Sequence, residues 1–215
     1  LGEHGPRMAW NLKQARRTLD AHPCEAIVVN ADPYAACLVG ARLAAERDLP
    51  LILDFRDPWA PCELRRPRRP APVRALVDRL ERSVVEQASA VVLNTETTLD
   101  DYRQHYADLP ADRFHCIRNH YDLDLIAGGQ HPGFDRFSLL FLGNFGRFIK
   151  ADVLLRTLAE LRRRGVPSQE LQLVVTGRFA AEAWQLAQGL GVQEMVRLHA
   201  HVPYRQIGAV MAASA

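Results

Sequence analysis

The sequence contains no hydrophobic run long enough to cross a membrane. Of its 215 residues, 48% are hydrophobic and 24% charged, and no stretch approaches the ~18–20 consecutive apolar residues that a membrane-spanning helix needs. The first residues, Leu1-Gly2-Glu3-His4-Gly5-Pro6, also lack the basic and then apolar pattern of a signal peptide. We therefore expect a soluble globular protein in the cytoplasm. Since the chain does not begin with methionine, we expect it to start partway into a larger gene product.

Metal-binding and disulfide patterns are also absent. The four cysteines are Cys24, Cys37, Cys62 and Cys116. Because no two of them form a C-x-x-C pair, they predict free thiols in a reducing compartment. His199 and His201 could share one face of a strand, but no third ligand is near in sequence. A solvated pair at a strand end is favoured there over a metal site.

The chain has little excess charge, since its net charge is +2. The exception is a basic stretch of seven arginines from Arg65 to Arg82. Such a run is usually a solvated loop. Nucleic-acid binding would require stacking aromatic residues or a recognition helix in context, so we expect no nucleic-acid partner. The remaining alternative is contact with an anionic membrane surface or with a phosphate-bearing acceptor.

Strand-like apolar runs alternate with helix-like patterns along the whole chain. The expected strands are 26–29, 51–55, 90–93, 114–117, 138–142, 171–176 and 196–198. The expected helices are 8–19, 33–47, 73–88, 97–106, 151–164, 181–190 and 204–213. In 73–88, valine and leucine recur at helical spacing with arginine and glutamate, Glu81 among them, between the apolar positions. Strict alternation predicts right-handed crossovers and doubly wound parallel α/β sheets.

A break in this pattern divides the chain. The segment 122–136 contains Gly128-Gly129 and Pro132-Gly133 and has no sustained periodicity, which is typical of a linker. We expect a first Rossmann-like domain at 1–125, a linker at 126–136 and a second, incomplete Rossmann-like domain at 137–215.

The turn after the second expected strand is the most informative segment. The apolar run 51–55 leads into Arg56-Asp57-Pro58-Trp59. Asp57 before Pro58 predicts a helix start, so Arg56, Asp57 and Trp59 would follow the carboxyl end of a strand, where α/β sheets place ligands. A base, an acid and a large ring suit a sugar or phosphate ligand. The alternative is an ordinary βα turn with an Arg–Asp pair.

Several short motifs, in this order, resemble the GT-B glycosyltransferases of family 4. The motifs are Val29-Asn30-Ala31-Asp32-Pro33-Tyr34, Asp54-Phe55-Arg56-Asp57-Pro58-Trp59, Ile117-Arg118-Asn119-His120-Tyr121-Asp122, Phe141-Leu142-Gly143, Val174-Val175-Thr176-Gly177 and Val202-Pro203-Tyr204, with the helix-to-strand passage 81–92. The resemblance implies two Rossmann-like domains, an acceptor-binding one and a nucleotide-sugar-binding one. It also implies sugar transfer with retention of anomeric configuration, no divalent metal and no cofactor.

The resemblance also assigns the donor side. Relatives carry a glycine, an arginine and a lysine after the first strand of the second domain. Here Gly143 stands in place, and Arg147 and Lys150 are slightly displaced. A helix start beside two cations is typical of a phosphate cradle, and the alternative is a solvent-facing loop. Gly177 and Arg178 are further expected donor contacts.

On the acceptor side, Arg56 and Asp57 stand where many relatives carry histidine and aspartate, and these two are the expected catalytic residues. The expected substrate-binding residues are Asn30, Asp32, Trp59 and Asn119. Because arginine does not supply a neutral imidazole, Arg56 is expected to bind phosphate or carboxylate instead.

Together these patterns predict a hexosyltransferase-type enzyme that uses a UDP- or GDP-linked sugar. The expected acceptor is a surface glycan or a lipid-linked sugar, and the expected location is the cytoplasm, with peripheral contact at the inner face of the membrane through Arg65 to Arg82. The family's Glu-x7-Glu motif lies beyond this chain, so we expect the chain alone to be inactive. The alternatives are a GT-B-like sugar-nucleotide epimerase and a non-catalytic binding or scaffold protein.

Overall fold

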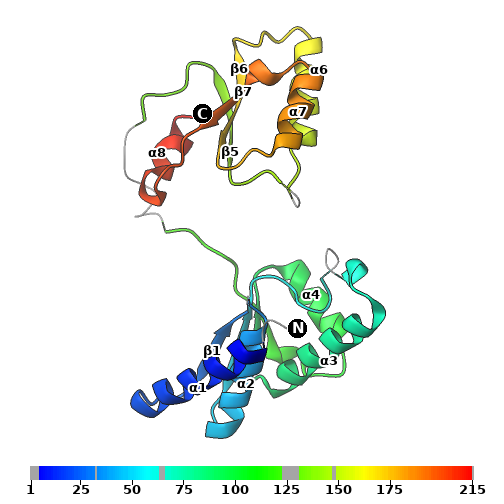
Figure 1. Ribbon diagram of the computed structural model, residues 1–215, viewed down its shortest axis with the longest axis vertical. Coiled ribbons are helices and arrows are strands. Elements are labelled where there is room, and N and C mark those ends of the chain that lie inside the picture. The colour runs from blue at the N-terminus through cyan, green and yellow to red at the C-terminus, as the bar shows by residue number, and fades with distance from the viewer. Residues whose placement is uncertain (1–4, 32, 63–65, 123–130, 147–148, 215) are drawn as a thin grey trace. The chain divides into compact units, whose positions relative to one another are not determined.

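The computed structural model divides into two compact units, Leu1–His120 and Tyr121–Ala215 (Figure 1). The structure describes residues 5–31, 33–62, 66–122, 131–146 and 149–214. Each unit has a parallel sheet and its own hydrophobic core, which confirms the predicted α/β class. The predicted linker 126–136 falls in the second unit, and its first five residues lie outside the described ones.

The first unit contains a four-stranded parallel sheet in the order β1-β2-β3-β4. The strands are β1 (Ile27–Asn30), β2 (Leu51–Phe55), β3 (Ala90–Leu93) and β4 (Phe114–Cys116). All four agree with the predicted strands to within one residue, because short runs of branched apolar residues suit a pleated, buried sheet.

The helices of the first unit are α1 (Gly5–Ala21), α2 (Ala35–Arg47), α3 (Ala71–Gln87) and α4 (Glu96–His105), with single 3₁₀ turns at Arg66–Arg68 and Ala111–Arg113. One face of the sheet is packed: Leu53, Phe55 and Val91 are fully buried there. The other face is open, and Val28 on it is 65% exposed. This asymmetry decides where a ligand can lie against the sheet.

Two predicted helix starts differ from the structure. Helix α2 begins at Ala35 rather than at residue 33, and Asp32 lies outside the described residues. No helix begins at Pro58. In the described chain, the next helical turn after β2 is the 3₁₀ turn Arg66–Arg68. Side chains from other elements bind the backbone of residues 57–60 and hold it in an irregular turn.

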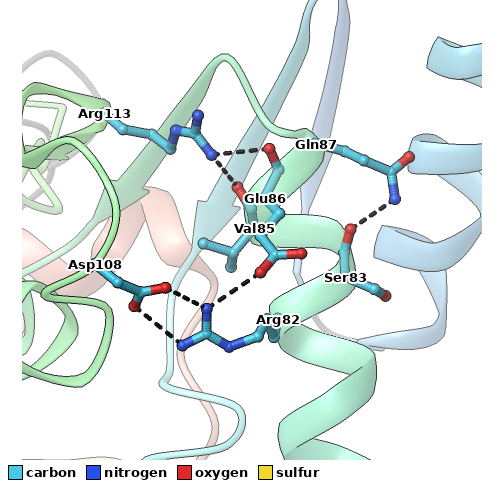
Figure 2. A network of polar contacts seen from close by, with 7 residues as sticks. All are labelled: Arg82, Ser83, Val85, Glu86, Gln87, Asp108 and Arg113. Atoms are coloured by element: carbon cyan, nitrogen blue, oxygen red, sulfur yellow. Dashed lines mark hydrogen bonds and ion pairs between the residues drawn. The ribbon is translucent and has the colours of Figure 1, made fainter.

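Arginines fasten the carboxyl end of α3 to the chain that follows α4 (Figure 2). The guanidinium of Arg113 donates to the carbonyl oxygens of Val85 and Glu86 at 3.0 and 2.8 Å, which satisfies two of the acceptors that a helix end leaves open. Arg82 forms two hydrogen bonds to Asp108, at 2.8 and 3.1 Å, and one to Glu86 at 3.1 Å. One cation of the basic stretch is therefore engaged within the unit.

The second unit contains a three-stranded parallel sheet in the order β5-β6-β7. Its elements are β5 (Phe137–Leu142), α6 (Asp152–Arg163), β6 (Leu171–Thr176), α7 (Ala181–Gly189), β7 (Val196–His199) and α8 (Ile207–Ala212), with 3₁₀ turns at Gln193–Met195 and Tyr204–Gln206. The predicted helix 204–213 thus starts as a 3₁₀ turn after Pro203. Across the described ranges, no helix is both long and apolar enough to span a bilayer.

Candidate functional site

An open pocket of about 640 Å³ lies on the first unit, at the carboxyl ends of its strands and over the open face of the sheet. Three of the residues expected to bind substrate or act on it, Asn30, Arg56 and Asn119, line this pocket. They follow β1, β2 and β4 or end them, so parallel strand direction brings these distant positions together.

The same pocket contains polar residues that the sequence did not single out as ligands. Asp54 accepts a hydrogen bond from the side-chain amide of Asn30, with an Nδ2–Oδ2 distance of 3.2 Å. Arg118 and His120 also line the pocket. The signal for Asp54 was present, because the strand alternation places it on the opposite face from buried Leu53 and Phe55. The pocket therefore carries two guanidinium groups, a carboxylate and two amides above an apolar floor.

Trp59 and Asp57 do not line this pocket. Trp59 is only 6% exposed, and its ring is stacked on Tyr34 with centroids 5.2 Å apart and planes 4° from parallel. The Tyr34 hydroxyl donates to the carbonyl oxygens of Asp57 and Pro58 at 3.3 and 3.1 Å. The indole therefore anchors the turn in the hydrophobic core, while Arg56 extends to the pocket.

A buried carboxylate also holds this turn. Glu81 on α3 is fully buried and accepts a hydrogen bond from the backbone N–H of Ala60. Burial raises the pKa of Glu81 to about 7, although hydrogen bonding to the Tyr102 hydroxyl and the Ala60 N–H opposes this rise. Helical spacing placed Glu81 between the apolar positions, and only the fold shows that it faces the core.

A second pocket of about 640 Å³ lies on the second unit, where the loops after β5 and β6 lead into α6 and α7. Lys150 and Arg178, both expected donor contacts, line it together with Gly146. Arg147 lies outside the described residues. Two carboxylates, Asp152 and Glu182, stand in the first turns of the helices and line the pocket too.

Both helix starts at this second pocket offer backbone donors. Ala151 and Ala180 occupy the N-cap positions of α6 and α7, and among the described residues no side chain caps either helix. The first N–H groups of an uncapped helix are available to a ligand, and the helix dipole favours an anion there. Two cations beside two such helix starts can bind a phosphate or diphosphate.

The two glycines expected at the donor side lie against each other. Gly143 and Gly177 have φ angles of +146° and +140°, and a Cβ on Gly177 would lie 2.0 Å from the carbonyl oxygen of Gly143. Asn144 joins the same loops, because its Oδ1 accepts the backbone N–H of Arg178 at 2.8 Å. No role was assigned to Asn144 from the sequence, and the fold shows that it positions Arg178.

The surroundings of His199 do not favour the metal site that the sequence analysis weighed at His199 and His201. His199 contacts the ring of His131, with centroids 5.7 Å apart, and its Nδ1 lies 2.9 Å from the carbonyl oxygen of Ala200. Among the residues that the structure describes, no three histidine, cysteine or acidic side chains form a group that could hold a metal ion.

Comparison with known proteins matches a family model, described as Glycosyltransferase Family 4, to residues 1–125. A curated relative, D-inositol 3-phosphate glycosyltransferase from Corynebacterium aurimucosum, is 28% identical over 155 residues, which are 62% of this chain and 35% of the relative. The chain thus spans about a third of the length of that relative.

Solved structures of low sequence identity share the fold. HepE (Alr3699) from Anabaena, in complex with UDP, has a TM-score of 0.62 at 19% identity, with 99% of this chain and 56% of that one covered. The lipopolysaccharide outer core galactosyltransferase WaaB has a TM-score of 0.57 at 11% identity, covering 96% and 53%. A UDP-N-acetylglucosamine 2-epimerase has 0.53 at 14%, covering 96% and 53%. Since transferases and an epimerase both match, the GT-B fold alone does not decide the reaction.

Proposed function

Because the chain belongs to glycosyltransferase family 4, we propose that the protein transfers a sugar from a nucleotide-sugar donor to an acceptor hydroxyl. The reaction proposed is hexosyl transfer with retention of anomeric configuration. Cleavage of the donor's glycosidic bond puts negative charge on the leaving diphosphate. Groups that are already in place to stabilise this charge accelerate the reaction.

The observation that carries this proposal is the convergence of Lys150 and Arg178 on one pocket with the starts of α6 and α7. Two cations and two sets of backbone N–H groups suit a diphosphate. In the proposed mechanism they hold the UDP or GDP moiety. Arg147, which the sequence predicts as a further donor contact, lies outside the described residues. Asp152 and Glu182 line the same pocket, and their negative charges oppose part of the attraction that the two cations exert on an anion.

For the acceptor, we propose a sugar or glycan that carries a phosphate or carboxylate. Arg56 and Arg118 both line the first pocket, and guanidinium groups bind such anions in a bidentate manner. Asn30, Asp54 and Asn119 offer hydrogen bonds to sugar hydroxyls. The name of the curated relative from C. aurimucosum gives a phosphorylated acceptor, which agrees with this chemistry. A lipid-linked sugar diphosphate is an acceptor of the same chemical class.

Peripheral contact with an anionic membrane is a further part of the proposal. In the basic stretch, Arg82 is engaged with Asp108 and Glu86, and Arg69 donates to the carbonyl oxygen of Trp59. Arg68, in the 3₁₀ turn before α3, and Arg79, on α3, are exposed. Val73, also on α3, is 38% exposed. Basic side chains near an anionic bilayer contribute about 1 kcal/mol each.

Calorimetric titration with UDP, GDP and their sugar conjugates tests the donor assignment. We expect one nucleotide to bind and the other to bind at least tenfold more weakly. Incubation of the complete protein with the preferred conjugate and inositol 3-phosphate, or a polyprenyl-diphosphate-linked sugar, then tests transfer, and the anomeric coupling constant of the product tests retention. Absence of binding by every nucleotide would overturn the proposed function.

A further inference from the structure

Four side chains from separate parts of the first unit bind the backbone of residues 57–60. The Tyr34 hydroxyl donates to the carbonyl oxygens of Asp57 and Pro58. The N–H of Trp59 donates to the hydroxyl oxygen of Tyr102 at 3.2 Å, and Arg69 donates to the carbonyl oxygen of Trp59 at 3.2 Å. The N–H of Ala60 donates to Glu81. These four residues, Tyr34, Arg69, Glu81 and Tyr102, are called the clamp below.

Glu81 is the member of the clamp whose presence is hardest to explain by packing. Its side chain is fully buried, with a relative solvent accessibility of 0%. Val84 and Val85, which follow it on α3, are buried as well. Burying a carboxylate is unfavourable by several kcal/mol unless it is paired or hydrogen-bonded. An apolar residue at this position of α3 would pack in the core without this cost, so the hydrogen bond that Glu81 accepts accounts for the carboxylate better than packing does.

What Glu81 binds is the turn that carries Arg56. Its Oε2 accepts the Ala60 N–H, whereas its Oε1 is buried and has no hydrogen-bond partner among the described residues. Arg56 stands four residues before Ala60 and lines the pocket of the first unit. The backbone between Arg56 and Ala60 is bound at each residue from 57 to 60, so Ala60 and Arg56 belong to one held turn.

We infer that Glu81 is a positioning residue, which fixes Ala60 and thereby the orientation of Arg56 toward the acceptor, without contacting the acceptor itself. This inference rests on the proposed function in assigning Arg56 to the acceptor. It assigns a role in the reaction to a core residue of α3.

The surroundings of Glu81 give the clamp a pH signature. Its titratable neighbours are Cys37 of α2, Asp78 of α3 itself, and Tyr102 and Tyr106 of the α4 end. Burial raises the pKa of Cys37 to about 12, and burial beside Glu81 raises the pKa of both tyrosines above their usual value. These three groups therefore keep their protons near neutrality, where Glu81 itself titrates.

Amide NMR of Glu81→Leu and Glu81→Gln tests this inference. Leucine leaves the Ala60 N–H without its acceptor, and we expect that amide to exchange at least tenfold faster, while the Leu53 amide in β2 reports that global stability is kept. Glutamine retains an acceptor oxygen and should restore protection of Ala60. Glu86→Leu, on an exposed position of the same helix, is the matched control and should leave Ala60 unchanged.

A pH titration of the same amides supplies the second measurement. In the wild type, the Asp57 and Ala60 signals should shift with a midpoint near pH 7, and in Glu81→Gln this titration should disappear. Unchanged Ala60 exchange in Glu81→Leu, or the same midpoint in Glu81→Gln, would overturn the inference. UDP titration separates the two proposals: Glu81→Leu should bind UDP like the wild type, whereas failure of the wild type to bind any nucleotide would refute only the proposed function.

Discussion

A Cβ atom on Gly177 would lie 2.0 Å from the carbonyl oxygen of Gly143. Both residues have positive φ angles, so each loop passes the other through a backbone conformation that L side chains rarely adopt. The contact sets the approach of the loops after β5 and β6, and those loops carry Lys150 and Arg178 to one pocket.

Gly177→Ala should therefore lower the free energy of unfolding by about 2 kcal/mol or more, because a positive φ costs about 1–3 kcal/mol for a residue with a side chain and the backbone clash adds to it. Gly165→Ala separates the two effects, since Gly165 has a φ of +92° but no atom near its Cβ position. It should lose only the conformational part. Chemical denaturation measures both variants, and equal losses would show that the Gly143 contact is unimportant.

Lys150→Ala and Arg178→Ala should each weaken UDP or GDP binding about 10- to 100-fold, because each removes a hydrogen bond to a charged group worth about 1.5–3 kcal/mol. Arg156→Ala is the matched control, since Arg156 is an exposed cation of α6 that does not line the pocket. Calorimetry on the three variants decides the assignment. If Arg156→Ala weakens binding as much as the other two, the effect is one of overall charge.

Asn144 variants separate loop positioning from charge. Asn144→Ala removes the acceptor of the Arg178 N–H and should lower the free energy of unfolding by about 1 kcal/mol. Asn144→Asp keeps an acceptor oxygen and should retain stability, but its added negative charge should weaken nucleotide binding. Thermal unfolding and nucleotide titration measure the two quantities. A fully stable Asn144→Ala protein would remove Asn144 from the list of positioning residues.

The ion pairs of Glu46 predict a pH dependence of stability. Hydrogen bonding to Arg16 holds the pKa of Glu46 at about 2, well below its ordinary 4.5. A lowered pKa stabilises the fold above pH 4.5, and this stabilisation is lost as the pH falls toward 2. The melting temperature of the wild type should therefore fall more steeply than that of Glu46→Gln across this interval. Parallel curves for the two proteins would contradict the prediction.

Reversal of exposed cations tests membrane contact. Arg68→Glu combined with Arg79→Glu should reduce binding to vesicles that contain anionic lipid at least tenfold, since each cation contributes about 1 kcal/mol near such a surface. Arg156→Glu combined with Arg205→Glu changes the net charge equally and lies on the second unit. Vesicle sedimentation compares the pairs. Equal loss in both pairs, or binding to neutral vesicles, would argue against a specific basic surface.

The strands could be predicted from the sequence because their signal is local. Short branched apolar runs bounded by proline, glycine or charge are typical of a buried strand, and all seven strands were placed to within one residue. The helix expected at Pro58 was wrong, because Asp57-Pro58 is a helix-start signal that distant side chains override. Tyr34 binds the carbonyl oxygens of Asp57 and Pro58, which a helix would have used for its own hydrogen bonds.

The candidate sites were only partly readable. Lys150 and Arg178 were expected as separate donor contacts, and the fold brings them to one pocket. Asp54 belongs to a motif but was given no ligand role, and Asn144 was assigned no role at all. Both roles depend on a residue at or just after the end of a neighbouring strand, Asn30 for Asp54 and Arg178 for Asn144. Trp59 was expected to bind substrate, yet the structure buries it against Tyr34.

By itself, the sequence determined the α/β class and the strand positions, because these depend on composition and on short-range order along the chain, and its motifs in order carried the family resemblance. The tertiary structure alone decided which face of α3 Glu81 occupies, which loops meet at Gly143 and Gly177, and which polar side chains share a pocket. Such relationships depend on crossovers and sheet register, which bring together residues 20 to 40 positions apart, as in the hydrogen bonds from Ala60 to Glu81 and from Arg178 to Asn144.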